Sequence, residues 1–204
     1  MSDAHTIVGG YVLARAVPRN QWQEQQLIPA EFLTVSRCLD DTPRPEFYSW
    51  FLTPEDAGWV GAALDPRPRL LTVGLRPADA QALLEVESAD STPTDATTDF
   101  GPFQLLATAA PMPGDARLLG FEVVGLGWAL SEFHSWLCHS YEREVWETLG
   151  IRPNAVGLLD TYEQASAIVT WMEDQPPDKA PEPMFWTAVT IAELPLPGRG
   201  SAEG

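Results

Sequence analysis

The segment SEFHSWLCHSYERE, from Ser131 to Glu144, holds the densest collection of reactive side chains in the sequence. Its candidates for chemistry are His134, Cys138, His139 and Glu142. His134 and Cys138 are four residues apart, so on a helix both would point toward one ion. The same spacing suits a cysteine nucleophile with a histidine base. Metal binding would need a third and a fourth ligand at suitable geometry.

Helical periodicity favours a structural role for these two side chains. At about 100° per residue, one broad helix face carries Leu130, Phe133, Leu137, Tyr141, Val145 and Leu149. His134 and Cys138 fall within this face. Cysteine is among the most buried residue types, which favours a core position. We therefore predict no catalytic residue, no metal and no cofactor. An enzyme of unrecognised family that uses His134, Cys138 and His139 remains the alternative.

The opposite face of the same predicted helix carries aromatic and basic side chains among polar ones. Tryptophan and arginine are the residues enriched at interface hot spots. This face is therefore a candidate partner-binding stripe, made of Trp136, His139, Arg143 and Trp146. The competing interpretation is that a second layer of the protein covers the tryptophans, because large aromatic side chains are mostly buried.

An acidic stretch, EVESADSTPTDATTD, spans residues 85–99 and is predicted to be an exposed loop, because it is rich in Ser, Thr and Asp and contains a proline. Its carboxylates could meet a basic groove on a partner and speed association. They could equally be only solvated. The candidate partner-binding residues here are Glu85, Glu87, Asp90, Asp95 and Asp99.

The aromatic run PEFYSWFLTPEDAGW could suggest a platform for a sugar or another ligand. At strand spacing, however, both faces of residues 46–52 are apolar. This pattern is typical of a central strand buried on both sides. Thr53 and Pro54 then give a helix start, with Thr53 as the cap.

Further strands are predicted near residues 6–17, 31–39, 70–75, 103–107, 118–124 and 184–194, with a hairpin between 103–107 and 118–124. Short helices are predicted at 54–64 and from Pro77 onward. Asp160, followed three residues later by Glu163, is similar to a capping box. The predicted fold is α+β, mainly an antiparallel sheet with two longer helices (about 132–149 and 161–173) packed on one face. Residues 1–194 are predicted to form a single domain, and 195–204 a flexible tail.

The charge of the chain limits its partners. Twenty-nine acidic residues against twelve basic ones give a formal net charge of −17, and Lys179 is the only lysine. Such a surface repels nucleic acid phosphates and anionic lipids, so we expect neither nucleic acid nor membrane as a partner. The acidity favours a basic protein partner, and a homodimer is also considered. Two cysteines are too few for a disulfide framework, and no secretory signal is visible, so a cytoplasmic location is expected.

Nucleotide-binding and hydrolase motifs such as GxxxxGK[ST], GxGxxG, GxSxG and HExxH are absent from the sequence. The stretch from Leu119 to Ala165, with LGFEVVG, FHSWLCHS and GIRPNAVGLLDTYEQA, resembles small bacterial proteins, some of which belong to the immunity proteins of polymorphic toxin systems. This resemblance implies an acidic, cytoplasmic, non-catalytic α+β protein that occludes a toxin, and it carries over no catalytic residue.

The leading hypothesis is therefore a non-enzymatic protein-binding module, an immunity-type inhibitor that occludes a cognate bacterial toxin. An accessory subunit of a larger assembly is a further alternative. It would require the face with Trp136 and Trp146 to be covered by another chain.

Overall fold

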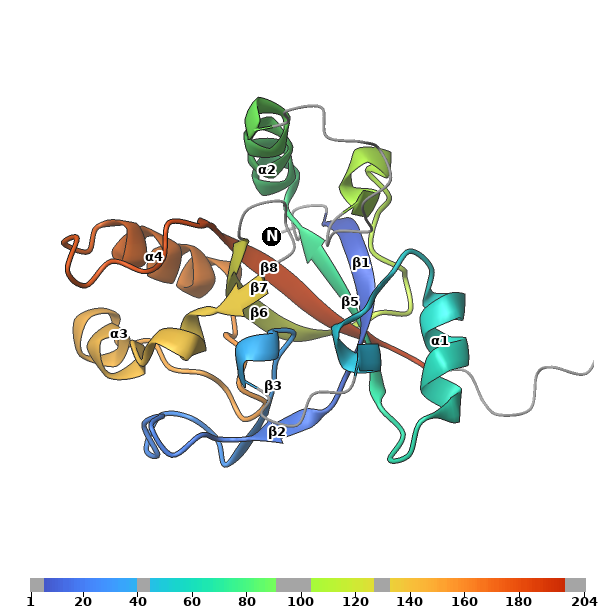
Figure 1. Ribbon diagram of the computed structural model, residues 1–204, viewed down its shortest axis with the longest axis horizontal. Coiled ribbons are helices and arrows are strands. Elements are labelled where there is room, and N and C mark those ends of the chain that lie inside the picture. Colours follow the sequence, from blue (N-terminus) through green and yellow to red (C-terminus); the bar gives the residue numbers. More distant parts are fainter. Residues whose placement is uncertain (1–5, 40–44, 91–103, 127–132, 197–204) are drawn as a thin grey trace, which may run out of the picture.

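A computed structural model of the chain describes residues 6–39, 45–90, 104–126 and 133–196. Its centre is a curled six-stranded sheet in the order β4-β1-β5-β8-β6-β7, in which each neighbouring pair is antiparallel (Figure 1). The strands are β1 (Ile7–Ala14), β4 (Trp50–Phe51), β5 (Arg69–Leu75), β6 (Arg117–Leu126), β7 (Phe133–Ser135) and β8 (Phe185–Leu194). A separate sheet pairs β2 (Ala16–Pro18) with β3 (Glu31–Leu33).

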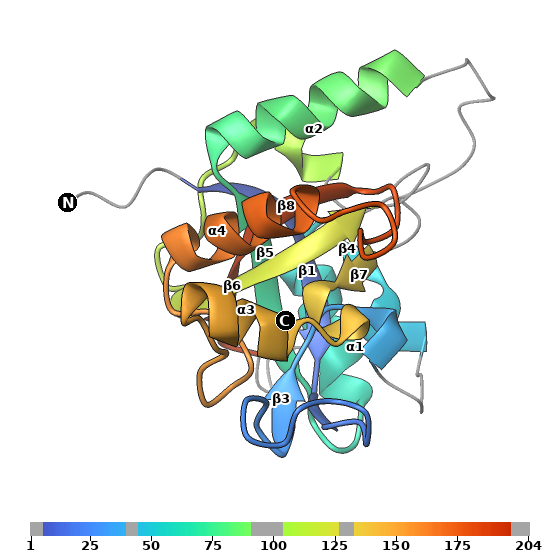
Figure 2. The same cartoon turned by 90° about the vertical axis from the view of Figure 1, so that its left-hand side faces the viewer.

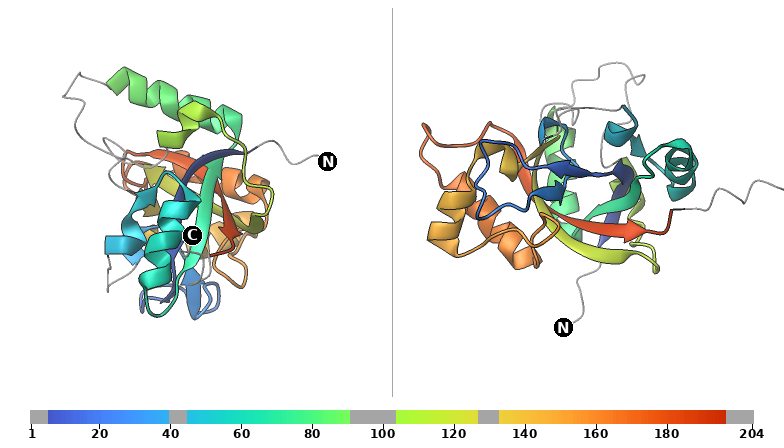
Figure 3. Two further views of the ribbon diagram at one scale, coloured as in Figure 1. Left: turned by 90° about the vertical axis from the view of Figure 1, so that its right-hand side faces the viewer. Right: turned by 90° about the horizontal axis from the view of Figure 1, so that it is seen from below.

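Among the described residues, the α-helices are α1 (Pro54–Ala63), α2 (Pro77–Asp90), α3 (Glu142–Leu149) and α4 (Tyr162–Glu173). α4 packs on β6 and β8, and α3 packs on α4. α1 contacts β1 and β5 on the opposite side of the molecule from α3 and α4 (Figure 1). Figures 2 and 3 show α2 above the end of the sheet. The predicted α+β class with a mainly antiparallel sheet is confirmed.

Four short 3-10 helices complete the described part of the chain: η1 (Arg37–Leu39), η2 (Pro45–Tyr48), η3 (Gln104–Thr108) and η5 (Trp136–His139). The core is organised around β8, whose successive side chains point to opposite faces of the sheet. Trp186 and Ala188 join the cluster that contains Ile168 of α4, whereas Val189 and Ile191 join the cluster on the other face. Each large aliphatic side chain buried in this way contributes roughly 1.5–3 kcal/mol.

The predicted starts of α1 and α4 agree with the structure to within one residue. At α1, the Asp56 N–H donates to Thr53 Oγ1 at 3.1 Å, as the sequence predicted. At α4, the cap is one residue later than predicted. Thr161, not Asp160, occupies the cap position, and its side chain and that of Gln164 each accept a backbone N–H from the other residue.

The prediction of one helix over 132–149 is wrong in its first half. Residues 133–139 form β7 and η5, and α3 begins only at Glu142. β7 pairs with β6, with Ser135 opposite Val124. Ser140 has a φ of 58°, a left-handed conformation that cannot continue a helix. Pairing with the edge of β6 therefore outweighs the helical periodicity of this segment.

Four other predicted elements differ from the structure. Residues 46–52 form the end of η2 and then β4, which has two residues and lies at the edge of the sheet rather than its centre. Residues 104–108 form η3, so the predicted hairpin with 118–124 does not exist. The predicted loop over 85–99 is helical over residues 85–90, which continue α2, and its remainder lies outside the described residues. Only the first three residues of the predicted strand 31–39 are a strand, β3.

Most of the predicted tail, residues 197–204, also lies outside the described residues. Leu196 itself packs against the cluster beside α1, and its carbonyl accepts a hydrogen bond of 2.7 Å from Arg67. In the described part of the chain, no helix is both long and apolar enough to cross a bilayer.

A tight turn at residues 154–159 joins the two sheets. The Leu33 N–H of β3 donates to the Val156 carbonyl at 2.8 Å, and Phe121 of β6 exchanges two backbone hydrogen bonds with Leu159. Between these contacts, Gly157 has a φ of 86°, and a Cβ there would lie 2.4 Å from Cβ of Phe32. The turn therefore needs glycine both for its backbone conformation and for the close approach of β3.

We expect Gly157→Ala to lower the free energy of unfolding by about 2–4 kcal/mol, from left-handed strain and a steric clash together. Gly150→Ala is the matched control, because Gly150 also has a positive φ, of 68°, but no atom lies near its added Cβ. The control should lose only about 1 kcal/mol. Urea denaturation of both variants measures the difference, and equal losses would show that Phe32 does not restrict this turn.

Candidate functional site

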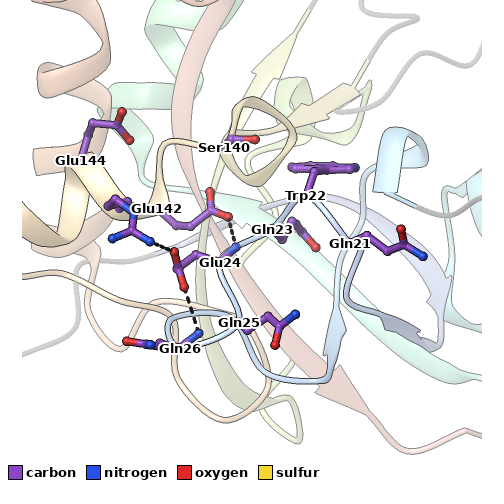
Figure 4. A pocket seen from close by; sticks show the side chains of 10 residues that line it. Gln21, Trp22, Gln23, Glu24, Gln25, Gln26, Ser140, Glu142 and Glu144 are labelled. Atoms are coloured by element: carbon purple, nitrogen blue, oxygen red, sulfur yellow. Dashed lines mark hydrogen bonds and ion pairs between the residues drawn. The ribbon is translucent and has the colours of Figure 1, made fainter.

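A hollow of about 550 Å³ lies between the loop that joins β2 to β3 and the start of α3. Figure 4 shows Trp22 and Glu24 of this loop near Ser140 and Glu142. Glutamines and carboxylates supply most of its surface, and the residues that line it are Gln21, Trp22, Gln23, Glu24, Gln25, Gln26, Ser140, Glu142, Arg143 and Glu144. We call this hollow the acidic groove.

Two hydrogen bonds and one ion pair join the two walls of the acidic groove, and a third hydrogen bond lies within the loop itself. The side-chain amide of Gln23, which is buried, donates to the Leu137 carbonyl at 3.3 Å. The Glu24 N–H donates to Glu142 Oε1 at 2.8 Å, and the Gln26 N–H donates to Glu24 Oε1 at 3.4 Å. Arg143 forms an ion pair with the Glu24 carboxylate. These contacts fix a loop that has no regular secondary structure of its own.

Glu142 is the least expected of these residues, because its side chain is only 2% exposed. Its Oε2 has no hydrogen-bond partner among the described residues. Burial raises the pKa of the Glu142 carboxyl; the Glu24 N–H lowers this pKa, and the charges of Glu144 and Glu24 raise it. A cation that approached this carboxylate would relieve the cost of burying its charge.

The groove therefore combines three carboxylates, on Glu24, Glu142 and Glu144, with one guanidinium, on Arg143. This balance favours a lysine or arginine side chain as a guest over an anion. Trp22, which is 48% exposed, adds an aromatic surface at the same place. Aromatic and charged groups arranged in this way are suited to recognising a basic protein surface.

The predicted partner-binding stripe is only partly exposed. Trp136 is 1% exposed and belongs to the core cluster, so it cannot contact a partner. It lies on the short 3-10 helix η5 rather than on the exposed face of a long α-helix, and its side chain points inward. Arg143 lines the acidic groove. Trp146 lies on α3 and is 42% exposed, with the Arg152 guanidinium 5.7 Å from its ring centroid.

His139, the fourth member of the predicted stripe, is packed among aromatic rings. It stacks on Tyr141 and meets Trp186 edge-on, with ring centroids 5.2 and 5.3 Å apart. Its Nε2 lies 3.1 Å from a carboxylate oxygen of Glu182, but without the geometry of a hydrogen bond. Burial lowers the pKa of His139, and the Glu182 charge opposes that change.

The three predicted acidic residues in the described part of the chain belong to α2, rather than to the loop and the helix α3 that form the acidic groove. Glu85 is exposed on α2, where it accepts a hydrogen bond from Gln81 at 2.9 Å. Glu87 and Asp90 also belong to α2, and Asp95 and Asp99 lie outside the described residues. α2 and α3 occupy different ends of the molecule (Figure 1). The described candidates therefore lie on two separate helices, with Glu85, Glu87 and Asp90 on α2 and Arg143 and Trp146 on α3.

A second cluster gathers Cys38, His134 and Cys138. The two cysteines, which are 100 positions apart, form a disulfide with a Cα–Cα distance of 6.6 Å. This bridge was not predicted, because two cysteines are too few to indicate a disulfide framework. The ligand atoms of the three side chains lie within 4.8 Å of one another. Because Cys138 is bonded to Cys38, it is not a thiolate nucleophile in this state, and the enzyme alternative loses its nucleophile.

A buried carboxylate, Glu122 of β6, lies next to the segment that leads to Cys38. Its Oε1 accepts a hydrogen bond of 3.3 Å from Thr34, and Ser135 and the Val35 N–H also donate to the carboxylate. Burial raises its pKa to about 7, although these hydrogen bonds lower it. Sequence reasoning missed this residue, although a glutamate inside the apolar strand LGFEVVG was a usable signal.

No family model, curated protein or solved structure matches the chain.

The buried Glu122 generates a pH prediction. The pKa of the Glu122 carboxyl is raised from 4.5 to about 7 in the folded protein. The protonated carboxyl therefore makes its full contribution to the free energy of unfolding at low pH. That contribution is lost as the pH rises through about 7. We therefore expect Glu122→Gln to match the wild type near pH 4 and to exceed its free energy of unfolding by up to about 3 kcal/mol near pH 8.

Urea denaturation at the two pH values measures this difference. Glu147→Gln is the control, because Glu147 is exposed on the same acidic protein. A gap between Glu122→Gln and the wild type that does not change with pH would contradict the assignment of a neutral Glu122 at low pH.

Proposed function

We propose that the protein is a non-enzymatic binding module that occludes a basic partner protein through its acidic groove. The observation that carries this proposal is the buried Glu142 carboxylate beside Glu24, Glu144 and the half-exposed ring of Trp22. A side chain of the partner that bears a positive charge would enter the hollow and pair with the exposed Glu144 and the partly exposed Glu24, while the buried charge of Glu142 adds to the attraction. The ring of Trp22 would supply the apolar contact that holds it.

We further propose that the partner is a bacterial toxin and that the protein inhibits it by covering its active site. The resemblance of residues 119–165 to immunity proteins supports this choice of partner. The net charge of −17 supports fast, electrostatically steered association with a basic surface. Such an inhibitor needs no catalytic residue, which agrees with a Cys138 that is bonded to Cys38.

The test uses the purified full chain and the separately purified products of the genes next to its own. We expect one basic product to bind with a dissociation constant in the nanomolar range or below. Its association rate should fall at least about tenfold from low to high salt. Co-expression should also restore the growth of cells that make this product. If no neighbouring product binds, the proposed toxin partner is wrong.

Two variants locate the binding surface. Trp22→Ala should weaken binding about thirtyfold, mainly by faster dissociation, as for a central interface tryptophan. Trp59→Ala is the matched control, because Trp59 is 81% exposed but lies on α1, away from the groove. If Trp59→Ala weakens binding as much as Trp22→Ala, the groove is not the contact surface.

A further inference from the structure

The cluster of Cys38, His134 and Cys138 has a feature that a disulfide does not require. A bridge needs only the two sulfurs, yet an imidazole nitrogen lies within 4.8 Å of both. The three side chains come from η1, β7 and η5, so the fold brings together residues that are far apart in the sequence. Two sulfurs and one imidazole are a donor set typical of zinc sites.

The surroundings of the cluster suit a bound cation. Ser36 Oγ lies 2.9 Å from Cys38 Sγ and 3.8 Å from Cys138 Sγ, where a hydroxyl can donate to a thiolate. Such outer contacts orient the ligands of a metal and tune their basicity. Cys38 is exposed, and the other two side chains are partly exposed, so solvent and ions reach the cluster.

We propose that the reduced protein binds a divalent zinc-like metal ion through the Cys38 and Cys138 sulfurs and an imidazole nitrogen of His134. The bridged and metal-bound states exclude each other, since a sulfur in a disulfide is not a thiolate ligand. Two thiolates neutralise the charge of the ion. Three protein ligands leave a fourth position for a water molecule, as in zinc sites that are not closed. This inference does not rest on the proposed binding of a toxin.

Conversion between the two states needs an external reductant. A trialkylphosphine donates two electrons to the disulfide and becomes a phosphine oxide by taking the oxygen of a water molecule. The two protons of that water end on the two sulfurs as thiols. The metal ion then displaces one proton from each thiol.

The experiment uses the full chain, reduced with such a phosphine, freed of it under an inert atmosphere and titrated with Co²⁺ as the probe. We expect one Co²⁺ per chain, with a thiolate-to-cobalt charge-transfer band and the visible bands of tetrahedral cobalt. Zn²⁺ should displace the Co²⁺ and bleach both. The oxidised chain should show neither band.

Variants distinguish metal binding at the cluster from adventitious metal binding elsewhere on the protein. Cys38→Ser or Cys138→Ser should abolish the charge-transfer band or leave it much weaker. His134→Ala should weaken binding by about tenfold or more, because even outer contacts to a ligand are worth that much. Glu147→Gln, which removes an exposed carboxylate of α3 outside the cluster, should bind as the wild type does.

Near-UV circular dichroism checks that the reduced chain keeps its fold. A folded reduced chain that gives no cobalt bands would overturn the proposal, as would binding that His134→Ala leaves unchanged. A reduced chain that unfolds and is not refolded by Co²⁺ or Zn²⁺ would also overturn it. A reduced chain that unfolds and regains its near-UV signal with one equivalent of metal supports it.

Discussion

The double pairing of β8 is the interaction on which the rest of the structure depends. β8 is hydrogen-bonded to β5 along one edge and to β6 along the other. Both of its faces are covered, by the α4 cluster and by the cluster of β1 and β5. β6 in turn holds β7 and the turn at 154–159, and these position η5 and β3. Both walls of the acidic groove are therefore positioned by β8, although β8 contributes no side chain to the groove.

The elements that the sequence predicted well have strong local signals. β8 has a long apolar run, and α1 and α4 have capping residues next to regular patterns. The segment around His134 shows the limit of such reasoning. Its apolar spacing fits a helix, but the fold uses it as an edge strand and a 3-10 turn, because β6 offers backbone hydrogen bonds there. The local sequence does not indicate that the edge of β6 is available for pairing with this segment.

The acidic groove could not be predicted for a related reason. Its central contact joins the Glu24 N–H to the Glu142 carboxylate, across 118 positions of sequence. The loop QWQEQQ has no periodicity, and Glu142 was considered only with its neighbours His134, Cys138 and His139 inside a predicted helix over 132–149. In the structure α3 begins at Glu142, so this residue lies in the first turn of the helix and its side chain points inward. Arg143 and Trp146 on α3 are exposed, as a partner-binding role requires, whereas Trp136 on η5 is buried, as the competing interpretation expected.

The two edge strands of the main sheet have a consequence for the way in which another protein can attach. β4 contains two residues and β7 contains three. Strands this short offer an incoming peptide few free amide and carbonyl groups, and short edge strands are a known protection against uncontrolled sheet extension. Recognition by adding a strand to these edges would gain few main-chain hydrogen bonds. If the proposed function holds, the partner would therefore be selected mainly by side-chain shape and charge, and its recognition would be sensitive to single substitutions on either protein.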